Sequence, residues 1–130
     1  MTTAQTSKMS NPAPGFTQHI DHKIELVPLQ PVEVKAGDEL IAKSAAAISL
    51  LEASHSPVLY IPRDDILTQI SKSDTSTYCP FKGQASYWNI EINGKVILDA
   101  AWSYDNPYDE MQAIKGHLAF YPDKAEIIQP

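Results

Sequence analysis

The stretch Ala85–Tyr104, ASYWNIEINGKVILDAAWSY, decides the fold because it carries the strongest hairpin signal in the chain. Two runs rich in aromatic and β-branched residues flank Asn93-Gly94, and this pair is preferred in a two-residue type I′ turn because both residues tolerate positive φ. The cross-strand partners that follow from this turn are Ile92 with Lys95, Trp88 with Asp99, and Tyr87 with Ala100. That register leaves neither face cleanly apolar, and a longer loop would shift it.

Shorter strand signals lie on both sides of this hairpin. They are Ile24–Pro28, Val32–Lys35, Glu39–Lys43, Pro57–Ile61, His117–Tyr121 and Ala125–Ile128. The residues between the second and third of these, Ala36-Gly37-Asp38, are typical of a hairpin turn in which Gly supplies the positive φ. Ala47–Glu52 is ambiguous, since its Ala and Leu content favours a helix and its brevity favours a strand. We therefore expect about eight strands.

Two short helices complete the predicted secondary structure. Asp64 is a candidate N-cap for a helix that ends near Ser71. Asn106 and Pro107 suit the N-cap and first position of a second helix, which Gly116 would end. Together these patterns predict a mainly β fold, a small antiparallel or barrel-like sheet with one or two short helices at its edge.

Length and composition limit the class of protein. The chain has 130 residues, ten Lys and Arg, sixteen Asp and Glu, and one Cys. A net charge of −6 argues against nucleic-acid and anionic-membrane binding, because both need a basic surface. We expect a flexible N-terminal tail over residues 1–21 and a single β-rich domain over residues 22–130. A polar N-terminus and a lone thiol favour a cytoplasmic protein.

The turn sequence Cys79-Pro80-Phe81-Lys82-Gly83 is the first candidate for chemistry. An ammonium close to a thiol favours the thiolate, which a nucleophile needs, so Cys79 and Lys82 are the candidate catalytic residues. The alternative is structural: Cys79 would be a small buried hydrophobe beside an extended lysine, and free Cys is among the most buried residue types.

Arg63 and Asp99 are charged candidates for ligand binding. Arg63 is the only arginine, and its guanidinium could clamp a phosphate or carboxylate or instead pair with Asp64, Asp65 or Asp99. Asp99 stands in an apolar stretch, where it could act as a general acid or base, hold Arg63 or Lys82, or cap a loop.

Aromatic residues with polar tips gather around these groups in the sequence, as they do in ligand pockets and also in ordinary β-sheet cores. They are Tyr60, Tyr78, Tyr87, Trp88, Trp102, Tyr104, Phe120 and Tyr121. The four histidines show no metal-binding spacing, and the chain has neither a Walker A nor a GxGxxG motif. We therefore predict no metal site and no cofactor.

Several motifs of the chain resemble the bacterial domain-of-unknown-function family four-twenty-seven, which is sometimes labelled nucleotidyltransferase-like. They are Pro57–Arg63, Thr77–Gly83 with Ala85 and Tyr87, Ala100–Tyr104 with Pro107, and Ile114–Pro122. The resemblance covers about residues 22–128. It implies a small β-tent architecture of mostly antiparallel strands. It also implies a shared pocket at Arg63, Cys79, Lys82, Tyr87, Trp102 and Tyr104.

Two functions of different class follow from these residues. The favoured hypothesis is a domain that binds a small anionic or aromatic ligand, nucleotide-like molecules included, through Arg63, Tyr87, Asp99, Trp102 and Tyr104, with catalysis by Cys79 and Lys82 left open. The alternative is a non-catalytic homo-oligomer, such as a homodimer, or a protein-interaction module that uses the same aromatic residues as its interface. A thiol-based redox or transfer role for Cys79 ranks last, because the chain has no second cysteine.

Overall fold

A computed structural model describes residues 11–28 and 31–129. Within these ranges ten strands form three antiparallel sheets, in the orders β1-β4-β5, β10-β2-β3 and β6-β7-β8-β9. The strands are β1 Ile24–Pro28, β2 Val32–Ala36, β3 Glu39–Ser44, β4 Ile48–Glu52, β5 Val58–Tyr60, β6 Gln69–Cys79, β7 Gly83–Ile92, β8 Lys95–Ser103, β9 Leu118–Phe120 and β10 Glu126–Ile128. The prediction of a mainly β, antiparallel fold is confirmed.

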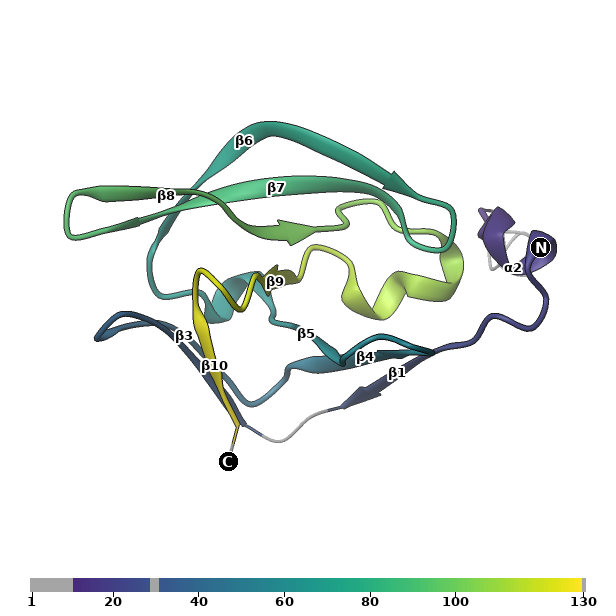
Figure 1. Ribbon diagram of the computed structural model, residues 1–130, viewed down its shortest axis with the longest axis horizontal. Helices are drawn as coiled ribbons and strands as arrows, with labels where there is room; N and C mark the ends of the chain where they lie inside the picture. The colour runs from purple at the N-terminus through teal and green to yellow at the C-terminus, as the bar shows by residue number, and fades with distance from the viewer. Residues whose placement is uncertain (1–10, 29–30, 130) are drawn as a thin grey trace, which may run out of the picture.

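The three sheets are arranged as two layers. Figure 1 shows β6, β7 and β8 above β1, β4 and β5, with β9 between them. Ile61 and Leu118 exchange backbone N–H···O bonds of 2.8 Å in each direction, so the end of β5 is tied to the start of β9. This bridge joins the upper sheet to the lower one at one side.

The central hairpin is confirmed, and its register is the first correction. Asn93 and Gly94 have φ of 52° and 78°, and Ile92 pairs with Lys95 as predicted. Beyond Ile90 the register shifts, so that Trp88 pairs with Ala101 and Tyr87 with Trp102, not with Asp99 and Ala100. A bulge in β8 causes the shift: Asp99 takes φ of 48°, and its backbone N–H donates to Asn89 Oδ1 at 2.9 Å.

The shift is two residues, so side chains keep their faces, but Ala101 instead of Asp99 now lies opposite Trp88. It places Trp88, Ile90 and Ala101 in one buried cluster with the residues of β2 and β3. Tyr87 and Trp102 are directly opposite each other and therefore share the other face of the sheet. There they belong to a second cluster with Ala85 and Tyr104.

The predicted hairpin of β2 and β3 is also present, with Gly37 at φ 62° in its turn. The ambiguous segment Ala47–Glu52 is a strand, β4, which lies between β1 and β5. Its Leu50 is buried, as a central strand requires.

Both helix predictions need correction. The helix expected from Asp64 to about Ser71 is wrong: only the 3₁₀ turn η1, Arg63–Asp65, forms there, and the chain enters β6 at Gln69. The second helix is shorter than predicted. It is the 3₁₀ segment η2, Asp109–Ile114, which is preceded by Tyr108 rather than capped by Asn106. Gly116, at φ 70°, follows it.

The N-terminal part of the described chain contains the short helix α2, Pro14–Gln18. The Gly15 N–H donates to the Pro80 carbonyl at 2.9 Å, and the Asn11 N–H donates to Asp109 Oδ2 at 2.7 Å. Residues 1–10, where half of the predicted tail falls, lie outside the described residues. None of the helices formed by residues 11–28 and 31–129 has the length and apolar character of a membrane span.

Candidate functional site

A half-buried carboxylate binds two basic side chains at one end of the molecule. Glu52, the last residue of β4, lies between His22 and Lys82. Its Oε2 is 2.7 Å from His22 Nε2, and its Oε1 accepts a hydrogen bond of 3.0 Å from Lys82 Nζ. The Glu52 and Lys82 side chains are only 13% and 12% exposed, so the pair is largely shielded from water.

The two partners of Glu52 determine its protonation. Burial raises the pKa of the Glu52 carboxyl, but hydrogen bonds from Lys82 and His22 and their charges outweigh it and leave the pKa below its ordinary value. Glu52 is therefore ionised at neutral pH and holds the Lys82 ammonium. An anionic ligand would have to compete with this carboxylate for Lys82.

The structure brings Cys79 and Lys82 together, as the spacing predicted. Cys79 ends β6, and Lys82 lies in the turn that leads into β7, where its Nζ is 3.9 Å from Cys79 Sγ. Gly83 makes this turn fit: it has φ of 115°, and a Cβ at its position would approach the Asn106 carbonyl oxygen to 3.4 Å. The thiol is half-buried.

A row of aromatic side chains continues from this thiol along the same face of the sheet. Tyr87 is linked to β6 by a 3.0 Å hydrogen bond between its hydroxyl and Thr77 Oγ1. Trp102 Nε1 donates to the Tyr60 hydroxyl at 3.2 Å, and its ring lies 4.5 Å from that of Tyr121. The Tyr87 and Tyr121 rings are nearly parallel, at 14°, with their centroids 6.5 Å apart.

The inner tyrosines of this row are neutral. Burial raises the pKa of Tyr60 and of Tyr104 well above the ordinary value, and the nearby acidic groups Cys79 and Glu52 add to the effect. Both phenols therefore remain protonated at physiological pH. Tyr60 thus accepts from Trp102 while its own proton stays available for a further hydrogen bond.

The outer part of the row borders a hollow of about 410 Å³. Its lining residues are Thr75, Tyr87, Asp99, Tyr121, Asp123 and Lys124. Two predicted ligand-binding residues, Tyr87 and Asp99, therefore meet here. Trp102 stands next to the hollow through its contact with Tyr121.

Asp99 reaches the hollow because of the β8 bulge. Its Oδ2 accepts a 2.7 Å hydrogen bond from the Thr75 hydroxyl. Hydrogen bonds from the Ser73 and Thr75 hydroxyls hold the pKa of Asp99 below its ordinary value, so the carboxyl is ionised. Its partners are thus hydroxyls of β6, whereas Lys82 pairs with Glu52.

Arg63 lies apart from the other predicted pocket residues. Its guanidinium carbon is 4.4 Å from the centre of the Trp88 ring, a cation–π contact. Trp88 and Tyr87 are neighbours in β7, so their side chains point to opposite faces of the sheet. The structure therefore joins Cys79, Lys82, Tyr87, Trp102 and Tyr104 on one face and leaves Arg63 on the other.

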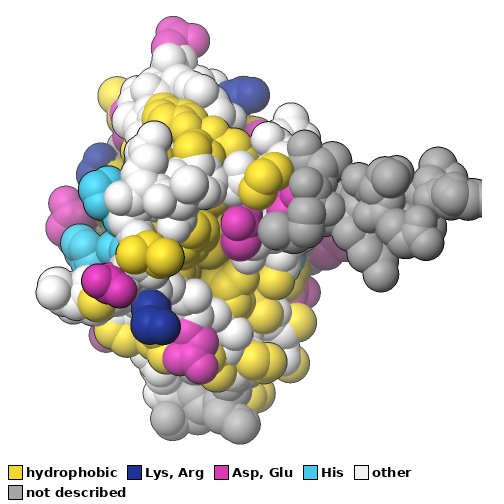
Figure 2. Space-filling view, turned by 90° about the vertical axis from the view of Figure 1, so that its right-hand side faces the viewer, with side chains coloured by type: hydrophobic (Ala, Val, Ile, Leu, Met, Phe, Trp, Pro, Cys, Tyr) yellow, Lys and Arg dark blue, Asp and Glu magenta, His cyan; other side chains and the backbone are white. Residues whose placement is uncertain are grey.

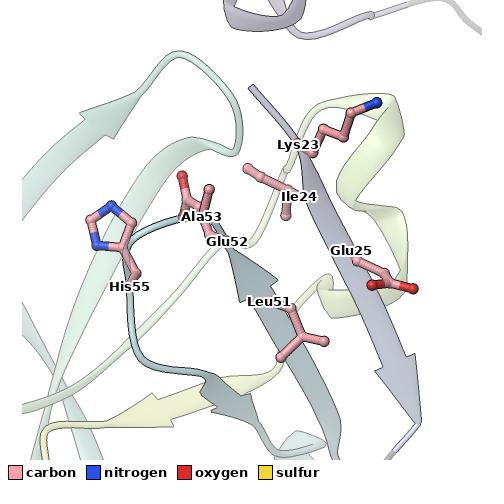
Figure 3. A pocket seen from close by; sticks show the side chains of 7 residues that line it. All are labelled: Lys23, Ile24, Glu25, Leu51, Glu52, Ala53 and His55. Carbon is pink, nitrogen blue, oxygen red and sulfur yellow. The ribbon is translucent and has the colours of Figure 1, made fainter. Parts of the chain in front are cut away.

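The end of the molecule that holds α2 and the β6–β7 turn is shown in Figure 2, where hydrophobic side chains gather in the middle of the face. Histidine side chains lie at its left edge, whereas acidic side chains lie both at the edge and beside the hydrophobic ones. A further hollow of about 520 Å³ lies beside β1 and β4 and is shown in Figure 3. Lys23 and Glu25 point away from β4 in that view, so most of the charge at this hollow faces outward.

Sequence reasoning missed Glu52 and His22. Each is 30 residues from its partner in the network, and neither stands in a motif. Tyr121 was recognised as part of the aromatic group but not as a lining residue of the hollow. Among residues 11–28 and 31–129, no group of three or more His, Cys, Asp or Glu side chains is placed to hold a metal ion.

Residues 26–129 match the family model described as Domain of unknown function (DUF427). The chain belongs to this family. The match covers every strand from β2 to β10 and three of the five residues of β1, so the expected family membership is confirmed. A comparison with curated proteins gave no match.

Proposed function

We propose that this DUF427 domain binds a small molecule through a planar aromatic portion that lies against Tyr87 and Tyr121. The observation that carries the proposal is the hollow of about 410 Å³, into which these two half-exposed rings converge beside an ionised carboxylate. Small-molecule sites commonly combine aromatic walls with a few fixed polar groups. Trp102 would stiffen the wall, because it contacts Tyr121 and donates to Tyr60.

Of the two ligand chemistries expected from the sequence, the aromatic one is better supported. Lys82 is held by Glu52, and Arg63 lies on the opposite face of the sheet over Trp88. Neither of the two predicted cations, Arg63 and Lys82, is therefore available beside the rings to bind an anionic group. Cys79 and Lys82 border the same face and would contact only a ligand that extends beyond Tyr87 toward the β6–β7 turn.

The test compares benzamide with cyclohexanecarboxamide, which has similar size but no aromatic face. Saturation-transfer NMR on the full chain should show binding of benzamide and much weaker binding of the saturated analogue, because stacking on Tyr87 and Tyr121 needs a planar ring. Tyr121→Leu should remove the difference. Tyr78→Leu is the matched control, since Tyr78 is 56% exposed and does not line the hollow.

Equal binding of the two compounds, or equal loss in the two variants, would contradict the proposal. Absence of benzamide binding would do the same. The alternative, that the aromatic face is a homo-oligomeric interface, predicts a dimer in sedimentation velocity that dissociates in Trp102→Ala.

We further propose a cytoplasmic location, because the single cysteine suits a reducing compartment.

A further inference from the structure

The 410 Å³ hollow is lined by more negatively charged than positively charged side chains. Two carboxylates, Asp99 and Asp123, and one ammonium, Lys124, line it. Lys124 Nζ donates to backbone carbonyl oxygens, at 2.8 Å to Leu98 and 3.4 Å to Asp99. In the described part of the chain neither carboxylate has a cationic side chain within 4.0 Å. The hollow therefore presents an excess of negative charge.

Asp99 also has unused hydrogen-bonding capacity. Its Oδ2 takes the Thr75 hydroxyl, whereas its Oδ1 is covered and has no hydrogen-bond partner among residues 11–28 and 31–129. An ionised carboxylate oxygen without a donor is costly, because the charge is only partly compensated. A donor in the hollow does not reach this covered oxygen, but it can bond to Oδ2, which has lone-pair capacity beyond the Thr75 hydrogen bond.

The aromatic rings add to this preference. The faces of Tyr87 and Tyr121 carry negative potential, which attracts a cation placed over them. Burial, the Tyr87 hydroxyl and the charges of Asp99 and Asp123 raise the pKa of Tyr121, so this phenol stays neutral beside the carboxylates. Both the rings and the carboxylates thus favour a positively charged ligand.

We infer that the hollow takes a planar cationic group, of the amidinium or guanidinium type, on the aromatic ligand of the proposed function. The planar cation would lie against Tyr87 and Tyr121 and donate to Asp99, and Asp123 would supply the second negative charge. This inference rests on the proposed function and deepens it, since it names the charge and shape of the ligand. It also reverses the anionic ligand expected from Arg63 and Lys82.

The experiment uses three compounds of the same size: benzamidinium, benzamide and benzoate. Titration of the full chain, followed by NMR chemical shifts, should give about tenfold tighter binding of benzamidinium than of benzamide, because both donate to Asp99 but only the amidinium carries the opposite charge. Benzoate should bind most weakly. Added salt should weaken benzamidinium binding and leave benzamide binding unchanged.

Asp99→Asn is the decisive variant, because Asn tolerates the left-handed φ of 48° and so preserves the bulge. In this variant the affinity for benzamidinium should fall to about that for benzamide. Asp74→Asn is the control, since Asp74 is an exposed carboxylate of β6 outside this hollow.

The outcomes separate the two claims. Binding of benzamide with no preference for benzamidinium, or a preference for benzoate, overturns the cationic inference and leaves the proposed function standing. A benzamidinium preference that Asp99→Asn does not change also overturns the inference. Failure of all three compounds to bind overturns the proposed function and the inference with it.

Discussion

Replacing Glu52 by Gln tests the network that anchors one end of the candidate site. Glu52 is 13% exposed and binds both Lys82 and His22, so the variant leaves the Lys82 ammonium, 12% exposed, without its counter-charge. Breaking a fully buried ion pair costs about 3–5 kcal/mol, and breaking an exposed one about 0.2–1 kcal/mol. This pair lies between those limits, and Gln keeps the shape and one acceptor. We therefore expect a loss of about 2 kcal/mol in the free energy of unfolding.

Urea denaturation at pH 7 is the assay. With a slope of about 1.5 kcal/mol/M, such a loss lowers the midpoint by about 1.3 M and leaves the slope unchanged. Glu33→Gln is the matched control, because Glu33 and Lys43 are 3.9 Å apart and 40% and 67% exposed. Its expected effect is below about 0.5 kcal/mol.

The pH dependence has a definite sign. The pKa of Glu52 in the folded protein lies below its ordinary value of 4.5, so its contribution is complete above that value and is lost as the pH falls through the folded pKa. The difference between wild type and Glu52→Gln should therefore be constant near neutrality and shrink below pH 4.5. Equal midpoints for the Glu52 and Glu33 variants, or a difference that persists unchanged at pH 3, would refute the reasoning.

Three further predictions concern other parts of the molecule. Ser103→Ala should cost about 1–3 kcal/mol in the free energy of unfolding, because the fully buried Ser103 hydroxyl accepts from Trp88 Nε1 at 2.9 Å; thermal unfolding measures this. Gly15→Ala should loosen the packing of α2, since the new Cβ would lie 2.6 Å from the Phe81 ring. Limited proteolysis should then cut near residue 15 faster than in the wild type, with a smaller effect on the thermal midpoint of the core. Iodoacetamide should alkylate the half-buried Cys79 more slowly in the folded chain than in urea, and equal rates would show that the thiol is freely exposed.

The hairpin and most strands could be predicted because their signals are local. Asn93 and Gly94 both have positive φ, which most other residues adopt only with steric strain, so these two adjacent positions are sufficient to place β7 and β8. The register beyond Ile90 could not be predicted in the same way, since the bulge at Asp99 contributes no local motif. The bulge removes Asp99 from the position opposite Trp88, which Ala101 takes in the buried cluster.

The helix expected after Asp64 failed for a related reason. Ile66, Leu67 and Ile70 fit one side of a helix, but Leu67 is 58% exposed and the chain extends into β6, which pairs with β7 over residues 69–72 and 76–79. Tertiary pairing overrode the local spacing. The candidate site shows the same limit: residues within one turn, Cys79 and Lys82, were found from spacing, whereas Glu52 and His22 were not.

The attachment of the N-terminal segment imposes an order on folding during synthesis. Asn11 and Ala13 donate to Asp109 and Glu110, contacts that span 98 and 97 residues of chain. Closing such long loops is slow relative to local hairpin formation. The contacts of Asn11 and Ala13 with η2 therefore form only after the ribosome has made nearly the whole domain, whereas the bond from Gly15 to Pro80 can form earlier, so the N-terminal segment is fastened in two stages.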